Sequence, residues 1–185
     1  MTDAHRPASA SVPSDPEGPE RGAPAPTKAD LYAELLVRLE GLVTGEPDWL
    51  ANLANAAAEI YTWLPGLNWA GFYLLRGGEL VVGPFQGRPA CVRIAIGSGV
   101  CGTAVDRRST QVVADVQAFP GHIACDPRSR SEIVVPIFDE GGNVTAVLDL
   151  DSDRVATFDE QDRAGLEAVA ELLSRTIDWG RACRS

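Results

Sequence analysis

A cysteine in a polar loop, Cys125, is the first residue whose surroundings could support chemistry. It belongs to the stretch GHIACDPRSRSEIVVPI, residues 121–137, in which turn-forming and charged residues lead into an apolar strand. Arg128 and Arg130 favour the thiolate, because a nearby cation lowers the pKa of a thiol, whereas Asp126 opposes that effect. The residue could therefore be a small buried side chain, a metal ligand or a nucleophile.

Three further cysteines, Cys91, Cys101 and Cys183, widen the range of chemistry. Cys91, Cys101 and Cys125 are spaced by 10 and 24 residues, and His122 lies three residues before Cys125. A zinc site with three cysteines and one histidine would use these four residues, but no closely spaced cysteine pair supports it. A buried, inert thiol is the commonest alternative for any one of them. We expect Cys183, near the C-terminus, to be incidental.

Acidic residues form a second candidate cluster on NVTAVLDLDS, residues 143–152. Strand alternation gives this segment a core face with Val144, Ala146, Leu148 and Leu150, and an opposite face with Thr145, Val147, Asp149 and Asp151. The two aspartates then lie about 7 Å apart. A solvated strand end is the usual explanation, but Asp149 is still inside the strand, where Asp is disfavoured. Glu132 begins the neighbouring strand, so three acids could converge to bind a cation or hold a proton at neutral pH.

Two other motifs resemble ligand sites but lack essential parts. GSGVCG matches G-x-G-x-x-G through Gly97, Gly99 and Gly102, yet only about eight residues separate it from the next strand, too few for a parallel crossover. We interpret it as a tight turn between a strand and a helix. Residues 149–160 carry acids at EF-hand positions, but Arg154 stands where that loop needs glycine, so we do not expect calcium.

Composition indicates one domain and a tail. The chain has 185 residues, and its net charge of -10 argues against nucleic acid or an anionic membrane as a partner. No run approaches the roughly 18 apolar residues of a membrane helix, and the N-terminus lacks the apolar core of a signal peptide. We therefore expect a cytoplasmic protein with reduced thiols. Residues 1–28, rich in Pro, Ala, Ser and Glu, are predicted to be disordered, and residues 29–182 to form the domain.

Hydrophobic periodicity predicts the elements that must position these side chains. Helical spacing predicts a first helix ending at Gly45, a second from Pro47 to near Trp63, and a third that a Thr157/Glu160 capping box opens and that ends near Arg181. Their apolar stripes are Leu31, Leu35, Leu39 and Leu42; Leu50, Leu53, Ala57 and Ile60; and Leu166, Val169, Leu173 and Ile177. The strands are predicted at NWAGFYLL, ELVVGPF, CVRIAI, TQVVAD, SEIVVPIF and NVTAVLDLDS, with GVCGTAVDRRS as a short helix. This pattern predicts an α+β fold with a mostly antiparallel sheet.

Four blocks of the sequence carry a family resemblance: NWAGFYLL, VVGPFQGRPACVRIAIGSGVCGTAV, VADVQAFPGHIACDPRSRSEIVVPI and AVLDLDS. They resemble the free methionine-(R)-sulfoxide reductases, a catalytic branch of the GAF-domain superfamily, over most of residues 31–180. The resemblance implies a six-stranded antiparallel sheet flanked by helices, usually in a homodimer. It also implies reduction of free L-methionine-(R)-S-oxide without a bound cofactor or metal. Thioredoxin is the implied reductant, with NADPH acting indirectly.

The resemblance also implies roles for individual residues. Cys125 matches the catalytic cysteine, Cys91 the resolving cysteine, and Cys101 a third, auxiliary cysteine. The pocket residues are matched by Trp69, Tyr73, Glu132, Asp149 and Asp151. The chain departs from the family at Ser98, which is often basic, and at the two arginines after CDP, where relatives tend to carry small residues.

The implied reaction is thiolate attack on the sulfoxide, a sulfenic acid, and then a disulfide that an external dithiol reduces. The alternative function is a non-catalytic GAF module that binds a small ligand or senses redox state. Such modules usually sit beside an output domain, and we expect no room for one in this chain.

Overall fold

The computed structural model describes residues 26–123 and 125–183. In that part of the chain, one six-stranded antiparallel sheet has the strand order β3-β2-β1-β6-β5-β4. The strands are β1 Trp69–Arg76, β2 Glu79–Gly87, β3 Arg93–Ala95, β4 Gln111–Val113, β5 Ser131–Phe138 and β6 Val144–Ser152. The sheet confirms the predicted α+β class and strand number.

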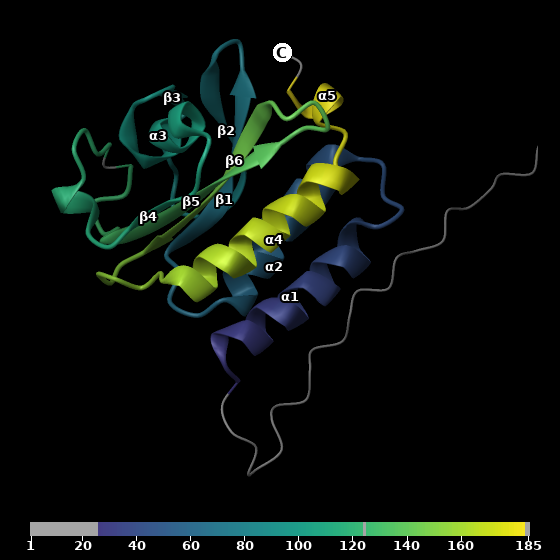
Figure 1. The fold of residues 1–185 in the computed structure, drawn as a ribbon, viewed down its shortest axis with the longest axis horizontal. Helices are drawn as coiled ribbons and strands as arrows, with labels where there is room; N and C mark the ends of the chain where they lie inside the picture. Colours follow the sequence, from purple (N-terminus) through teal and green to yellow (C-terminus); the bar gives the residue numbers. More distant parts are fainter. Residues whose placement is uncertain (1–25, 124, 184–185) are drawn as a thin grey trace, which may run out of the picture.

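The helices divide between the two faces of the sheet (Figure 1). α1 Lys28–Val43, α2 Trp49–Trp63 and α4 Glu160–Thr176 cover one face, and the short α5 Trp179–Ala182 follows α4. The other face carries α3 Gly99–Arg107 and the loop with the 3-10 turn η1 Val116–Ala118. No described helix has both the length and the apolar sequence that crossing a bilayer requires.

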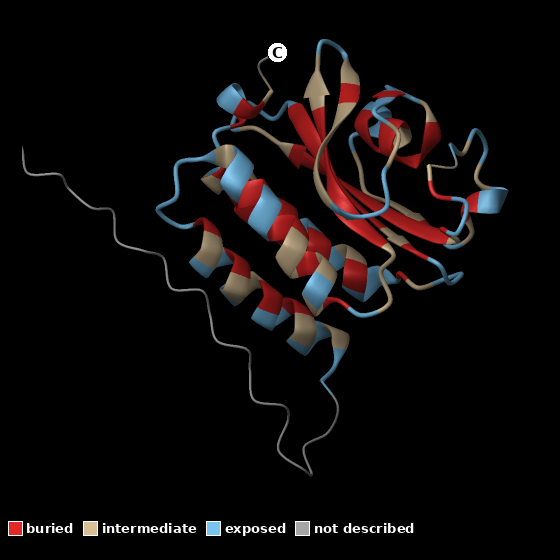
Figure 2. Cartoon of the chain, turned by 180° about the vertical axis from the view of Figure 1, so that it is seen from behind, coloured by how far each residue is buried: buried red, intermediate tan, exposed pale blue. Residues whose placement is uncertain are grey.

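Alternation along the central strands creates two separate hydrophobic clusters. On β1, Phe72 packs toward the α1–α2–α4 side and Tyr73 toward the α3 side. Figure 2 shows the central strands buried along most of their length. The predicted core face of β6 is confirmed for Ala146, Leu148 and Leu150. Val144 instead packs on the α3 side, where the pairing of β5 with β6 is irregular.

The glycine motif does not form a nucleotide-binding crossover. β3 precedes the motif and β4 follows α3, and these two strands lie at opposite edges of the sheet. Gly102 is required by close packing, since a Cβ there would lie 2.3 Å from the carbonyl oxygen of Ala95. The prediction of a tight strand-to-helix turn is therefore confirmed.

Two predicted helix starts are wrong because other side chains cap the helices. Asp48 caps α2 by accepting from the N–H groups of Leu50 and Ala51, both at 2.9 Å, so Pro47 lies outside the helix. Leu50 is 50% exposed and does not belong to the buried stripe.

The capping box of α4 is formed by Asp159 and Asp162 rather than by Thr157 and Glu160. Asp159 Oδ1 accepts from the N–H groups of Gln161 at 2.8 Å and Asp162 at 3.3 Å, so the helix begins after Asp159, two residues beyond Thr157. All four residues of the predicted stripe are buried: Leu166, Val169 and Leu173 lie in α4, and Ile177 is its C-cap. The α4 helix ends at Thr176, and α5 is separate from it.

The start of α1 is fixed to the start of α4. The predicted tail lies outside the described residues up to position 25, and its last residue, Lys28, is the first residue of α1. The Lys28 ammonium pairs with Asp159 at 2.9 Å and with Asp162. Tyr32 Oη donates to Asp162 Oδ1 at 3.0 Å. These contacts hold the first and last long helices together on one side of the sheet.

Gly165 on α4 offers a test of this helix packing. A Cβ at position 165 would lie 2.1 Å from the Tyr32 ring, whereas a Cβ at Gly41 in α1 would meet nothing within 4 Å. Replacing glycine by alanine within a helix normally stabilises by up to about 1 kcal/mol, and we expect Gly41→Ala to do so. Gly165→Ala should instead destabilise by about 1–3 kcal/mol through overpacking. Urea denaturation measures both, and equal stabilisation by the two changes would contradict this packing.

Candidate active site

The sheet register brings the predicted acids together. Glu132 on β5 pairs with Asp151 on β6, and Asp151 pairs with Trp69 on β1. Two residues back along β6, Asp149 pairs with Gly71. Positions two apart share a strand face, so the acids and Trp69 lie on the α3 side of the sheet.

Aromatic rings form a wall beside the acids. Trp69 stacks on Tyr73 with ring centroids 5.9 Å apart and on Phe85 of β2 with centroids 5.2 Å apart. Gly71 permits this wall, because a Cβ there would lie 2.3 Å from Phe85 Cβ. Sequence reasoning missed Phe85. A glycine inside a strand can mark a position where another chain segment approaches closely. Gly71, inside the predicted strand NWAGFYLL, was the feature of the sequence that could have indicated this contact.

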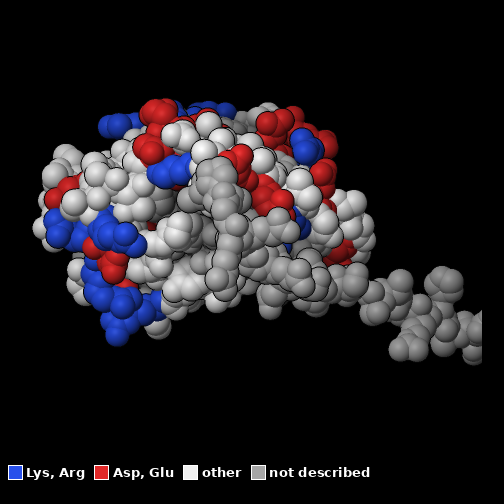
Figure 3. Space-filling view, turned by 90° about the horizontal axis from the view of Figure 1, so that it is seen from below, with Lys and Arg blue, Asp and Glu red and all other residues white. Residues whose placement is uncertain are grey.

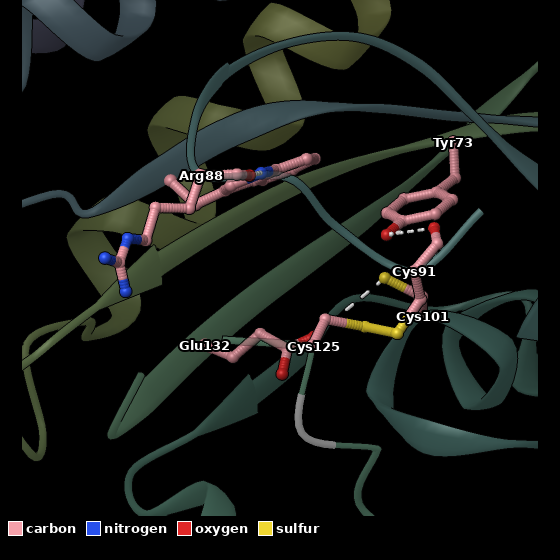
Figure 4. Close-up of a disulfide and its surroundings, with 7 residues drawn as sticks. Tyr73, Arg88, Cys91, Cys101, Cys125 and Glu132 are labelled. Atoms are coloured by element: carbon pink, nitrogen blue, oxygen red, sulfur yellow. Dashed lines mark hydrogen bonds between the residues drawn. A yellow bond between two sulfur atoms is a disulfide. The ribbon is translucent and has the colours of Figure 1, made fainter. Parts of the chain in front are cut away.

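A disulfide joins Cys91 to Cys125, with the Cα atoms 5.4 Å apart (Figure 4). Two side chains of β1 fix the segment before Cys91: Tyr73 Oη donates to the Cys91 carbonyl at 3.1 Å, and Trp69 Nε1 donates to the Arg88 carbonyl at 3.1 Å. Both cysteines are partly exposed. An external thiol could therefore approach the bond.

The segment after Cys125 is held by its own polar contacts. Asn68 Nδ2 donates to Ser129 Oγ at 3.0 Å, and Arg128 pairs with Asp126 at 2.7 Å. The hydrogen bonds from Arg128 lower the pKa of Asp126 to about 2. Ser129 was also missed in the sequence, because only folding brings this loop beside Asn68.

The predicted effect of two arginines, opposed by Asp126, on the pKa of the Cys125 thiol stays a prediction. Arg128 pairs with Asp126, and Arg130 pairs with Asp115 at 3.3 Å. The Cys125 sulfur is in the disulfide. Figure 3 shows the largest group of Lys and Arg side chains at the lower left of that view, with further ones among the acidic side chains along the top and right, on a chain with a net charge of -10.

Burial dominates the electrostatics of the acids. Glu132 and Asp149 are only 7% and 5% exposed, and Asp151 is half-buried. Desolvation raises the pKa of Asp149 to about 7 and raises the pKa values of Glu132 and Asp151, which the charge of Asp149 raises further. No described lysine or arginine forms an ion pair with these three carboxyls. The cluster of Glu132, Asp149 and Asp151 therefore keeps part of its protons near neutral pH.

Cys101 belongs to the acid cluster rather than to the disulfide. Its Sγ donates to Glu132 Oε1 at 3.9 Å, and burial followed by the charge of Asp149 raises the pKa of the Cys101 thiol. Cys101, Glu132 and Asp149 place one sulfur and two carboxyl oxygens within 4.8 Å of one another, a set that could hold a metal ion. A zinc set with His122 does not form, since Cys91 and Cys125 are bonded to each other.

Seven of the eight predicted site residues line one pocket, and Cys91 joins it through the disulfide. The seven are Trp69, Tyr73, Cys101, Cys125, Glu132, Asp149 and Asp151. Asp149 Oδ1 is buried there with no hydrogen-bond partner among the described residues. Such an atom is costly to leave unpaired, so the pocket suits a ligand that carries a strong donor. Cys183 lies elsewhere, and its Sγ donates to the Thr145 carbonyl at 3.3 Å.

Residues 47–178 match the family described as the GAF domain. The fold and pocket thus define a GAF domain whose pocket adjoins a cysteine pair. Free methionine-R-sulfoxide reductase of Escherichia coli is 47% identical over 150 residues, which are 81% of this chain and 90% of that protein. The Saccharomyces cerevisiae enzyme of the same name is 43% identical over 156 residues, covering 80% of this chain and 87% of that one.

A solved structure agrees with these relatives. The X-ray structure of free methionine-R-sulfoxide reductase from Neisseria meningitidis, in complex with its substrate, has a TM-score of 0.81 and 48% identity, covering 86% of this chain and 95% of that chain. The chain belongs to the free methionine-R-sulfoxide reductase family of GAF-domain proteins.

The raised pKa of Asp149 predicts how stability depends on pH. The folded state holds a proton that the unfolded chain releases near pH 4, so stability falls as pH rises from about 4 to about 7. We expect Asp149→Asn to be more stable than the unmutated protein at pH 8, by on the order of 2–4 kcal/mol. The two should be nearly equal at pH 4.

Urea denaturation of the disulfide-bonded proteins at both pH values measures this difference. Glu171→Gln, which removes an exposed carboxylate, is the matched control and should show little pH dependence relative to the unmutated protein. An unmutated protein that is the more stable of the pair at pH 8 would rule out an unpaired buried charge at Asp149.

Proposed function

We propose that the chain reduces free methionine-(R)-sulfoxide to methionine, with Cys125 as the nucleophile and Cys91 as the resolving cysteine. The observation that carries the proposal is that the Cys91–Cys125 disulfide adjoins a pocket lined by two buried carboxyls, Glu132 and Asp149, and the half-buried Asp151. Relatives with this named activity, at 43–48% identity, support it.

The first step transfers the sulfoxide oxygen to Cys125. A carboxyl of the acid cluster protonates that oxygen, which makes the sulfur electrophilic, and the Cys125 thiolate attacks. The attack forms an S–S bond between Cys125 and the substrate sulfur. The hydroxyl group then moves from the substrate sulfur to the Cys125 sulfur, the S–S bond breaks, methionine leaves with its electron pair, and Cys125 becomes a sulfenic acid. Glu132 suits the donor role, because burial raises its pKa and it belongs to the pocket lining.

The second step forms the disulfide. The Cys91 thiol attacks the Cys125 sulfenic acid and releases water, which completes a two-electron oxidation of the cysteine pair. The geometry of this product is the one in the structure, with Cα atoms 5.4 Å apart. An external dithiol then returns both cysteines to thiols and becomes a disulfide itself.

Substrate recognition uses the rest of the pocket. Asp149 and Asp151 accept from the substrate ammonium, which supplies the donor that the unpaired Asp149 Oδ1 lacks. Trp69 presents its π face to the S-methyl group, where it favours the positive charge that develops on sulfur. Tyr73 positions Cys91 through its 3.1 Å hydrogen bond to the carbonyl. Cys101 is an auxiliary thiol that hydrogen-bonds to Glu132.

Thioredoxin, itself reduced at the expense of NADPH, is the proposed dithiol. The partial exposure of both disulfide cysteines supports access by a protein partner. A cytoplasmic location and a homodimer complete the proposal and rest on family membership and the use of reduced thiols.

Separate cysteine variants test the division of labour. Without added dithiol, Cys125→Ser should release no methionine from the sulfoxide in a single turnover. Cys91→Ser should release about one equivalent and stop as the sulfenic acid, since attack precedes resolution. Quenched-flow measurement of methionine per enzyme checks this, with Cys183→Ser as a control that should behave like the unmutated chain.

The same experiment separates the alternatives. Equal loss of single-turnover release in Cys125→Ser and Cys91→Ser would contradict the assigned order. A ligand-binding or redox-sensing GAF module would form the disulfide with an oxidant but release no methionine over repeated cycles with dithiothreitol.

A further inference from the structure

Exposed apolar side chains gather around the disulfide. Six large apolar side chains are exposed in the described residues, and three of them, Val92, Ile96 and Ile123, lie within five residues of a disulfide cysteine along the chain. They are 63%, 42% and 38% exposed. Single exposed apolar residues are ordinary, but a group of them around a reactive bond indicates a surface that binds a partner.

The fold places these three side chains on the α3 side of the sheet. Val92 and Ile96 flank the edge strand β3 and alternate with Ile94, which is buried in the hydrophobic cluster on the α3 side. Positions two apart along a strand share one face, so Val92 and Ile96 point to that side as well. A Cβ at Gly99 would lie 3.4 Å from Ile123, which places Ile123 against the first turn of α3, three residues after Ile96.

The segments that carry the disulfide also lack negative charge. The Cys91–Cys125 bond joins residues 80–105 to residues 116–125 (Figure 4). Neither segment contains Asp or Glu, although the chain has 26 acidic residues. Neither segment therefore presents a carboxylate that would repel a thiolate or an acidic protein.

Reduction of the disulfide requires close contact with the reductant. A thiolate of the reductant attacks one sulfur of the bond, forms a mixed disulfide and releases the other cysteine as a thiolate. The second thiol of the reductant then breaks the mixed disulfide, so that two electrons and two protons pass to Cys91 and Cys125 and the reductant becomes a disulfide. In a protein reductant, the residues around the attacking thiol must lie against the residues around Cys91 and Cys125.

We propose that Val92, Ile96 and Ile123 form the docking surface for a protein dithiol that has apolar residues around its reactive thiol. The inference rests on the proposed function for the identity of the partner, thioredoxin, and adds the surface that selects it. A small dithiol reaches the same bond without burying these side chains. The surface therefore favours a protein reductant over a small thiol.

Reduction of the disulfide, followed without any sulfoxide, tests the surface. The oxidised protein is mixed with reduced thioredoxin or with dithiothreitol, quenched with acid and alkylated, and its free thiols are counted by mass spectrometry. We expect Val92→Ser/Ile96→Ser to lower the rate constant with thioredoxin by about 10-fold, the scale of losing apolar contacts at the centre of an interface. The rate constant with dithiothreitol should stay within about two-fold. Ile123→Ser, on the other cysteine segment, should give the same pattern.

Val37→Ser/Leu50→Ser is the matched control. These two exposed residues lie on α1 and α2, which cover the other face of the sheet, so both rate constants should equal those of the unmutated protein.

Three results would overturn the inference. They are unchanged rates with thioredoxin in the Val92/Ile96 and Ile123 variants, equal losses with thioredoxin and dithiothreitol, and a change in sedimentation that shows a second copy covering the surface. The proposed function is tested separately: failure of the unmutated protein to reduce methionine-(R)-sulfoxide with dithiothreitol would remove that function, while the comparison of disulfide reduction rates would still stand.

Discussion

The rest of this structure depends on one constraint: two buried carboxyls and a half-buried one cluster together, and no described lysine or arginine forms an ion pair with them. Desolvation of Glu132, Asp149 and Asp151 disfavours their charged forms, so the cluster holds protons that exposed acids would lose. The same environment keeps Cys101 a neutral thiol. In the proposed function, the group therefore holds a proton for the sulfoxide oxygen and leaves an acceptor for the substrate amine.

The two faces of the sheet have different roles: one forms the main hydrophobic core, and the other carries the pocket. One face packs on α1, α2 and α4 through an apolar core that supplies stability. The other face is free to place acids, aromatic rings and cysteines under α3 and its neighbouring loops. Strand register converts distant sequence positions into one row, as in the alignment of Glu132, Asp151 and Trp69. Functional side chains on rigid strands are held more firmly than those on loops.

Local sequence patterns predicted the parts of the site that depend on the two-residue alternation of side chains along a strand. Alternation on residues 143–152 placed Asp149 and Asp151 away from the core face, as the structure has them. The pairing of Cys91 with Cys125 came only from the family resemblance, because spacing alone left several pairings open. Contacts that only tertiary structure creates were missed: Phe85 against Trp69 and Ser129 against Asn68. The helix starts were wrong because competing hydrogen bonds selected other caps.

Titration of Asp149 tests the central claim most directly. Carbon-13 NMR of the aspartate carboxyls, in a Cys125→Ser variant that cannot turn over, would follow this group with and without methionine-(R)-sulfoxide, and Asp149→Asn would assign its signal. The account predicts a midpoint near 7 without substrate, falling by more than about one unit when the substrate ammonium pairs with the carboxylate. A midpoint below about 5 in the free protein, close to that of an ordinary aspartate, would contradict it.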